Sequence, residues 1–141
     1  MLNLQLFIPK KAQSHRQEKV SSEIRYFVAQ MFIRADWYPV KSKTTGEYMK
    51  LLGLVSIVSV NVSPDLKRAT VYISNSQPEH EKNNLEFLKS QRVLVRKYIA
   101  QNVQLRNAPE INFRVDAEFD DRTRLLTKID EISAQLREKK D

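Results

Sequence analysis

The sequence predicts one α+β domain whose helices and strands follow in the order α-β-β-α-α-β-α. Three observations predict this class. Alternating apolar and polar residues at 53–63 and 68–74 flank a short turn, which is the pattern of a β-hairpin. A third alternating segment lies much later, at 110–116. The segments around these strands repeat apolar residues at helical spacing, and 141 residues suffice for one domain with a sizeable core.

The first helix is predicted over residues 14–33. Ser14 and Gln17, three positions apart, match the capping-box pattern that starts a helix. Pro39 disfavours helical backbone just before it, so the helix ends ahead of residues 36–39. Its apolar stripe consists of Val20, Ile24, Phe27 and Met31. Its more polar side carries Arg16, Lys19 and Arg25.

Residues 41–50 are polar, carry three lysines and one glycine, and indicate a mobile loop before the hairpin. Within the hairpin, Pro64 presets a turn, and the Asp65 side chain can accept a hydrogen bond from the backbone just beyond it. Lys67 and Arg68 put positive charge at the hairpin tip. The dry face of the two strands is predicted to carry Val58, Val60 and Val62, and then Ala69, Val71 and Ile73.

After a polar linker at 75–83, residues 83–103 are predicted to be helical. An apolar stripe at helical spacing is formed by Leu85, Leu88, Val95 and Ile99. One continuous helix would put Arg92 inside this stripe. A break near residues 91–93 removes the conflict and is the favoured prediction, whereas the alternative is a single helix whose Arg92 side chain reaches out to solvent.

The third strand, at 110–116, starts after Pro109, where a strand loses a hydrogen-bond donor at little cost. The last helix is predicted over 120–139, with acidic residues at its start and lysines at its end that complement the helix dipole. Its apolar stripe consists of Leu125, Ile129, Ile132 and Leu136. Because this stripe is narrow, we expect the helix to be partly mobile or to depend on a partner.

The chain has 24 Lys and Arg residues against 17 Asp and Glu residues, which gives a net charge of +7 and a pI near 9.7. Residues 1–50 carry nine basic and four acidic side chains, whereas residues 101–141 carry eight and nine. A basic surplus of this size indicates a phosphate-rich partner such as a nucleic acid. The last third of the chain does not share the surplus.

Several residue types are scarce, and this excludes classes of chemistry. The chain has no cysteine, so disulfides, thiolate zinc sites and cysteine nucleophiles are excluded. Its two histidines, His15 and His80, are far apart, and its two glycines cannot form a glycine-rich phosphate loop. No apolar run approaches the roughly 20 residues of a membrane span. We therefore expect a soluble, cytoplasmic protein without a cofactor, and no group of residues supports catalysis.

The hairpin and its surroundings also carry a specific combination of motifs. Gly53-Leu54-Val55 precedes the segment 60–67, which contains the Ser-Pro-Asp-Leu-Lys turn, and residues 69–74 follow it. Arg96 and the segment 105–113 continue the pattern at matching spacing. Further matches lie upstream at Arg16, Lys19, Val20 and Ile24, and downstream at Arg124, Leu125 and Leu126. With these features, residues 14–130 resemble the ribosome-binding factor A family of bacterial ribosome-maturation proteins.

The resemblance implies a KH type II-like fold, in which a three-stranded sheet has helices packed on one face. It implies binding to the immature small (30S) ribosomal subunit through 16S rRNA, during late maturation and processing of the 5′ end of that RNA. KH modules clamp the RNA backbone through a GxxG loop between two helices, and the family has a small-residue kink there. This chain has Gln91-Arg92-Val93 instead, and its loop at 41–50 is longer than the family pattern.

These features divide the chain into three predicted parts. Residues 1–13 are an N-terminal extension that is expected to be flexible, residues 14–118 are a KH-like RNA-binding domain, and residues 119–141 are a C-terminal amphipathic helix. The expected partners are 16S rRNA and the free small ribosomal subunit. We expect a monomer with no membrane association.

Basic residues near the predicted helix break are the main candidates for phosphate contacts, because Lys and Arg neutralise backbone charge and release counterions. This group is Lys89, Arg92, Arg96, Lys97 and Arg106. Further candidates are Lys67 and Arg68 at the hairpin tip, and Arg16, Lys19 and Arg25 on the first helix. The alternative for each group is a solvated charged surface without a ligand. Tyr72 is interpreted as a cross-strand packing residue rather than a base-stacking one.

Two functions of other classes remain open. The last helix suits a protein-interaction module that acts through its amphipathic face. An acidic cluster suits an RNA-processing enzyme that uses a metal ion or acid–base chemistry. That cluster is Asp116, Glu118, Asp120 and Asp121. Its position at a strand end and helix start favours helix capping instead.

Overall fold

The computed structural model describes residues 14–139, so the extension predicted at 1–13 lies outside the described residues. The helices are α1 (His15–Arg34), α2 (Glu81–Ser90), α3 (Arg92–Asn102) and α4 (Ala117–Lys139), with a short 3-10 helix at Pro78–His80. The strands are β1 (Val55–Val62), β2 (Arg68–Asn75) and β3 (Glu110–Val115). The predicted α+β class and the order of elements are confirmed.

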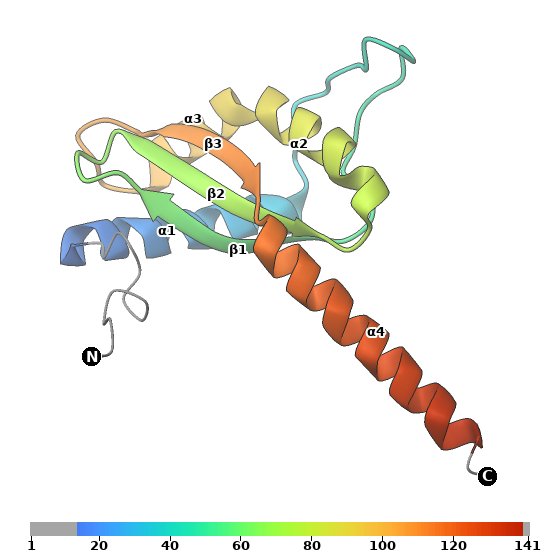
Figure 1. Ribbon diagram of the computed structural model, residues 1–141. Helices are drawn as coiled ribbons and strands as arrows, with labels where there is room; N and C mark the ends of the chain where they lie inside the picture. Colours follow the sequence, from blue (N-terminus) through green and yellow to red (C-terminus); the bar gives the residue numbers. More distant parts are fainter. Residues whose placement is uncertain (1–13, 140–141) are drawn as a thin grey trace, which may run out of the picture.

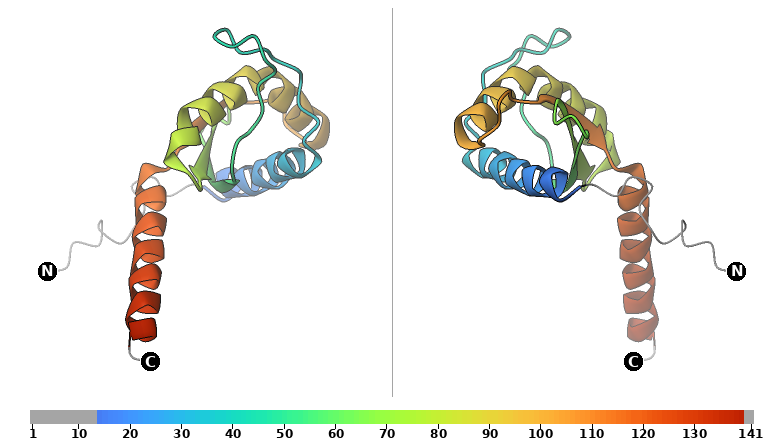
Figure 2. Two further views of the ribbon diagram at one scale, coloured as in Figure 1. Left: turned by 90° about the vertical axis from the view of Figure 1, so that its right-hand side faces the viewer. Right: turned by 90° about the vertical axis from the view of Figure 1, so that its left-hand side faces the viewer.

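The three strands form one sheet with β2 in the centre. β1 pairs with β2 in antiparallel fashion, and β3 pairs with β2 in parallel fashion. Parallel neighbours need a crossover connection, which α2 and α3 provide here. α1, α2 and α3 lie on one face of the sheet, whereas α4 projects away from the domain beyond β3 (Figures 1 and 2). The three-stranded sheet with helices on one face is the fold that the resemblance implies.

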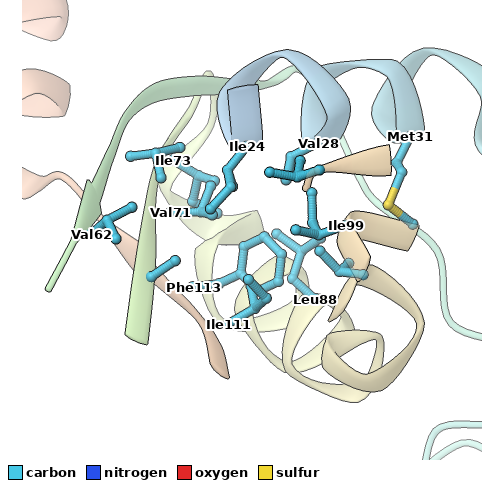
Figure 3. Packing of buried hydrophobic residues seen from close by; sticks show 14 of the residues in the cluster. Ile24, Val28, Met31, Val62, Val71, Ile73, Leu88, Ile99, Ile111 and Phe113 are labelled. Atoms are coloured by element: carbon cyan, nitrogen blue, oxygen red, sulfur yellow. The ribbon is translucent and has the colours of Figure 1, made fainter. Parts of the chain in front are cut away.

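The core lies between the sheet and the three helices that cover it. Its side chains come from one face of each strand, as the period of two requires, and from the inward stripe of each helix. Burial of each large apolar side chain stabilises the fold by roughly 1.5–3 kcal/mol. Figure 3 shows Ile24, Val28 and Met31 of α1 with Leu88, Ile99, Val62, Val71, Ile73, Ile111 and Phe113.

The predicted capping box starts α1. The Gln17 N–H donates to Ser14 Oγ at 3.2 Å, and the Ser14 N–H donates to Gln17 Oε1 at 2.8 Å. The Gln17 side chain is buried and also donates from Nε2 to the carbonyl of Val62 at 2.8 Å. One residue therefore caps the helix and ties its start to the end of β1.

The turn between β1 and β2 is built around Asp65, as predicted. Its carboxylate accepts hydrogen bonds from Ser63 Oγ at 2.6 Å and from the Lys67 N–H at 3.0 Å. These two bonds, that from Ser63 first, lower the pKa of the Asp65 carboxyl below its ordinary value. Leu66 completes the turn with a left-handed φ of 61° and donates its N–H to the Ser63 carbonyl.

The prediction that Val58 lies on the dry face of β1 is wrong. Ile57 pairs with Ile73 and Ser59 pairs with Tyr72, which leaves Val58 as the extra residue of a β-bulge. The bulge shifts the alternation by one residue. Val55 and Ile57 consequently pack against the core, together with the buried Val60 and Val62.

The predicted break in the helical segment at 83–103 is confirmed. α2 ends at Ser90 and α3 begins at Arg92, with Gln91 in a non-helical conformation between them. The alternative of one continuous helix is therefore wrong. The predicted stripe misses Phe87, which is 2% exposed, and includes Leu85, which is only partly buried.

Other boundaries shift by a few residues. β3 ends at Val115, and α4 starts at Ala117 rather than at 120, because Asp116 Oδ1 accepts the N–H of Phe119 and caps the helix. The loop predicted at 41–50 contains an antiparallel bridge between Lys41 and Tyr48. The division of the chain near residue 119 stays a prediction, as does the partial mobility of α4.

Candidate nucleic-acid interface

The kink between α2 and α3 is held by the fully buried side chain of Gln91. Its Oε1 accepts the N–H of Tyr38 at 2.9 Å, and its Nε2 donates to the carbonyl of Tyr38 at 2.8 Å. A buried amide is stable when both of its polar ends are hydrogen-bonded, as they are here. This chain therefore builds its kink with a buried amide that is hydrogen-bonded to the segment after α1.

Lys89 and Arg92 flank this kink, and both are exposed. Arg92 Nε donates to the carbonyl of Lys89 at 3.0 Å, so the guanidinium covers one of the free carbonyls at the end of α2. The start of α3 has no side-chain cap, which leaves its first backbone N–H groups available to an anion.

Arg96 has a structural task as well as an exposed position. Its Nε and Nη2 donate to the carbonyl of Ala108 at 3.2 and 3.1 Å, which fixes the connection between α3 and β3. Arg92 and Arg96 also line a cleft of about 290 Å³ between α3 and the edge strand β3. Glu110 lies in the same cleft and supplies an acidic group there.

The hairpin tip lies beside this cleft. The Glu110 N–H donates to the carbonyl of Lys67 at 2.8 Å, and Arg68 pairs with Glu110 in the sheet register. Arg106 is exposed in the connection that Arg96 fixes. We call the cations that the fold brings to this side the kink surface, which consists of Lys67, Arg68, Lys89, Arg92, Arg96 and Arg106.

The other predicted cations lie elsewhere, three of them on α1 and Lys97 on α3. Lys97 lines a hollow of about 350 Å³ with Arg34 and Tyr98. Arg16 and Lys19 line a larger hollow of about 690 Å³ beside Tyr26, which is 59% exposed. Tyr26 was missed in the sequence-based prediction. It lies seven residues after Lys19, about two turns of α1, so helical spacing alone puts the two side chains on one side of the helix. Arg25 is exposed on α1 and lines neither hollow.

The domain and α4 differ in the number of ion pairs that they form. Within residues 14–139, ion pairs occur in α4 alone, and no lysine or arginine of the kink surface lies within 4.0 Å of a carboxylate. The pairs are Arg122–Glu118 at 3.6 Å, Arg124–Asp120 at 3.7 Å and Arg124–Asp121 at 3.5 Å. The kink surface is therefore a set of cations that form no ion pair within the described residues, although Glu110 lies in the same cleft, and such unpaired cations suit phosphate binding.

The acidic cluster at the start of α4 has the capping and pairing contacts that its position predicts. Asp116 caps the helix, and Glu118 and Asp121 pair with arginines one turn on. Asp120 is 3% exposed, and burial raises the pKa of its carboxyl, which Arg124 partly offsets. Among the described residues, no three His, Cys, Asp or Glu side chains are arranged to hold a metal ion.

Comparison with known proteins identifies the family of the chain. The family model for ribosome-binding factor A matches residues 16–129, from the start of α1 into α4. The chain belongs to the ribosome-binding factor A family. The family membership that the motifs predict is thus confirmed. No helix within the described residues has the length and apolar character needed to cross a membrane.

Individual relatives cover most of the chain. Ribosome-binding factor A of Acetivibrio thermocellus is 37% identical over 127 residues, which span 89% of this chain and 95% of that protein. The Methylobacterium nodulans protein of the same name is 31% identical, over 87% of each chain. A Thermotoga maritima solution structure, itself proposed to be a ribosome binding factor A, superposes with a TM-score of 0.56 at 27% identity, over 73% of this chain and 89% of that one.

The crystal structure of ribosome-binding factor A from Thermus thermophilus is more distant in sequence. It superposes with a TM-score of 0.55 at 16% identity, over 70% of this chain and 94% of that one. This similarity supports the shared fold. It carries no information about individual binding residues.

Proposed function

We propose that this protein is a non-enzymatic ribosome assembly factor that binds the immature 30S subunit through 16S rRNA. In this proposal it acts as a cytoplasmic monomer and assists late maturation of the subunit, including processing of the 16S rRNA 5′ end. Family membership supports a role on the ribosome. The observation that carries the RNA contact is the kink surface, whose cations have no ion-pair partner in the described chain.

The geometry of the kink suits the RNA backbone. Arg92 has its Nε on a helix carbonyl, so its guanidinium is oriented before any ligand arrives. An oriented arginine loses less side-chain freedom on binding than a free one. The uncapped start of α3 adds backbone N–H donors beside it. Lys89 supplies a second charge on the other side of the break.

The RNA contact is tested by exchanging cations at the kink and measuring binding against salt concentration. In the variant, Lys89→Gln is combined with Arg92→Gln, and purified small subunits or 16S rRNA are the ligands. Each lost phosphate contact lowers the slope of log affinity against log salt by about 0.7–0.9. The loss of affinity between 50 and 200 mM salt should therefore become about 7- to 12-fold smaller than for the unchanged protein.

A matched control removes the same charge from α4. Lys128→Gln with Arg137→Gln changes the net charge equally but leaves the kink intact. We expect this control to bind with nearly the original salt dependence. If both variants behave alike, net charge rather than the kink surface determines binding, and this site assignment is wrong.

The maturation role needs a test in cells. Cells that lack the protein should accumulate 16S rRNA with an unprocessed 5′ end, which primer extension measures directly. The unchanged gene should restore processing, and the kink variant should restore it less well at equal protein level. Normal 5′ ends in the deletion strain would contradict this part of the proposal.

A second candidate function is a protein-interaction module that acts through α4. The observation in its favour is the exposure of the α4 stripe, whose four members are each 49–59% exposed. Docking through these apolar side chains would depend little on salt, in contrast to phosphate binding. The enzyme alternative would gain support from magnesium-dependent RNA turnover that is lost in Asp120→Asn or Asp121→Asn.

A further inference from the structure

The long connection between α1 and β1 contains a small ordered hairpin, residues 40–50, which we call the lysine hairpin. Lys41 and Tyr48 form an antiparallel bridge. The Ser42 N–H donates to the Glu47 carbonyl at 2.8 Å, and the Met49 N–H donates to the Val40 carbonyl at 2.8 Å. Gly46 has a φ of +71° at the turn, a conformation that glycine adopts without strain.

Two buried amides fix the ends of this connection to α2 and the kink. Gln91 forms two hydrogen bonds with the backbone of Tyr38 before the hairpin. Asn84 is fully buried and forms two with the backbone of Leu52 after it, both at 2.9 Å. Asn83 Nδ2 adds a bond to the Lys50 carbonyl at 3.0 Å. The hairpin therefore starts and ends at defined positions on α2, beside the kink surface.

Aromatic packing adds a third attachment at the base of the hairpin. The Trp37 ring makes edge-to-face contacts with Phe87 and Phe32, at centroid distances of 5.7 and 5.5 Å. Phe87 belongs to the buried core. From this base the hairpin extends outward past α2, on the side of the domain away from α4 (Figures 1 and 2).

The outward surface of the hairpin is cationic. Lys41, Lys43 and Lys50 are exposed, and none of them lies within 4.0 Å of a carboxylate in the described chain. Glu47 is the one acidic residue between positions 40 and 50. Tyr48 is 65% exposed, and Lys41 Nζ lies 5.3 Å from the centre of its ring. Cations beside an exposed aromatic ring match what a nucleic-acid backbone and an unpaired base require.

The chemistry of the tip favours RNA over a protein partner. Ser42, Thr44 and Thr45 offer hydroxyl groups, and the tip has no large apolar side chain to fill a pocket on a protein. Protein interfaces depend on such buried anchors. Lysine is a compact point charge, which suits a phosphate backbone that needs no paired geometry.

We infer that the lysine hairpin is a second RNA-binding element, which contacts phosphates beyond those that the kink surface meets. Four residues of extended chain from Val40 to the tip span roughly 13 Å, so the hairpin reaches well past its attachments on α2. The inference rests on the proposed function, because it assumes that RNA is bound at the neighbouring kink.

The experiment replaces the three lysines by glutamine, as Lys41→Gln, Lys43→Gln and Lys50→Gln in one protein. Affinity for purified small subunits and for 16S rRNA is measured between 50 and 200 mM salt. Loss of three phosphate contacts should make the salt-induced drop in affinity about 20- to 40-fold smaller. The α4 control, Arg122→Gln with Lys128→Gln and Arg137→Gln, removes the same charge and should leave the drop unchanged.

A second variant shortens the lysine hairpin without changing the net charge of the protein. Replacing residues 42–47 by Asn-Gly closes the hairpin with a two-residue turn. This change removes Lys43 and Glu47 together, so the net charge stays the same. Hydroxyl-radical footprinting should then show loss of protection at RNA positions distant from the kink, with kink protection retained. Thermal unfolding of both variants should match the unchanged protein, because the anchors at Tyr38 and Leu52 are untouched.

The outcomes distinguish the two proposals. If the unchanged protein shows no salt-dependent RNA binding, the proposed function fails. If it binds and the kink variant is impaired, but the lysine variant keeps its full salt dependence and footprint, the hairpin inference alone is overturned. Retained binding to naked 16S rRNA with lost binding to whole subunits would show that the hairpin contacts a ribosomal protein, which also overturns the inference.

Discussion

Helices α1 and α4 carry similar apolar stripes and differ in what covers them. On α1, Val20, Ile24, Val28 and Met31 are at most 8% exposed, whereas the stripe of α4 is 49–59% exposed. The stripe of α1 lies between the sheet and α3. Helix α4 contacts the domain chiefly through its first turn, which lies against the end of β2. Helical spacing therefore predicts which face of a helix is apolar. It does not predict whether the same chain supplies the surface that covers that face.

The two regions also differ in charge. Residues 14–116 carry 16 basic and 10 acidic side chains, whereas residues 117–139 carry five and six. Three of the six α4 acids pair with α4 arginines, while the cations around the kink have no such partners within the described chain. The domain thus carries the basic surplus, whereas α4 is nearly neutral and exposes its apolar stripe. The two regions suit partners of different chemistry.

The largest expected effect compares the same substitution in both helices. Ile24→Ala in α1 should lower the free energy of unfolding by about 2–5 kcal/mol, because it leaves a cavity in the core. Ile132→Ala in α4 should change it by less than about 0.5 kcal/mol, because that side chain is 56% exposed. Urea unfolding measures both. A similar loss in the two variants would show that the α4 stripe is covered in solution.

A smaller effect is expected at Gln91. Gln91→Ala removes two hydrogen bonds and leaves the N–H and carbonyl of Tyr38 without their partner, which should cost about 1–3 kcal/mol. Unfolding free energy measures the cost, and amide exchange at Tyr38 reports the released backbone. Exchange at Tyr38 as slow as in the unchanged protein would contradict the assigned role of this side chain.

Amide hydrogen exchange compares the two regions without substitution. We expect the backbone amides of residues 121–138 in the free protein to exchange much faster than those of β2. The reason is that few tertiary contacts oppose local opening of α4. Saturating amounts of small subunits should slow α4 exchange if the helix acquires a partner there. Equally slow exchange in α4 and β2 of the free protein would remove the distinction.

The smallest effect concerns the attachment of α4 to the domain. Burial raises the pKa of Asp120 above its ordinary value of 3.8, so the folded protein binds this proton more tightly than the unfolded chain. Stability from this group is therefore present at low pH and is lost as pH rises through the folded pKa. Asp120→Asn should remove this dependence and slightly stabilise the protein at pH 7. The test is to measure the free energy of unfolding against pH for the unchanged protein and for Asp120→Asn. Identical pH profiles for the two proteins would contradict the prediction.

Local patterns explain how much of the fold could be predicted. The position of Arg92 within an apolar stripe predicts the break at Gln91, and the Asp65 turn follows from side-chain chemistry close in the sequence. The bulge at Val58 has no such signal, because a run of valines fits either register and no glycine marks the extra residue. Long-range pairing with Ile73 and Tyr72 determines the register there.

The candidate site was predictable to a similar extent. Arg92 and Arg96 are 40° apart on a helix and share a cleft, whereas Lys97 points toward α1. All three were predicted as one group from the sequence, although the 100° between successive residues of a helix turns Lys97 away from Arg96. The ordered lysine hairpin was not predictable, because its anchors join residues 53 and 32 positions apart in the chain. Such contacts arise from tertiary structure alone.

The double anchoring of the connection by Gln91 and Asn84 has a consequence for how this protein tolerates changes of length. The two ends of the segment between Tyr38 and Leu52 are held by Gln91 at the kink and by Asn84 of α2, so a change of length at the hairpin tip leaves both attachments in place. Doubling such a closed segment costs only about 0.6 kcal/mol in chain entropy. Insertions, deletions or a grafted peptide should be accommodated at this position with the remaining architecture unaltered.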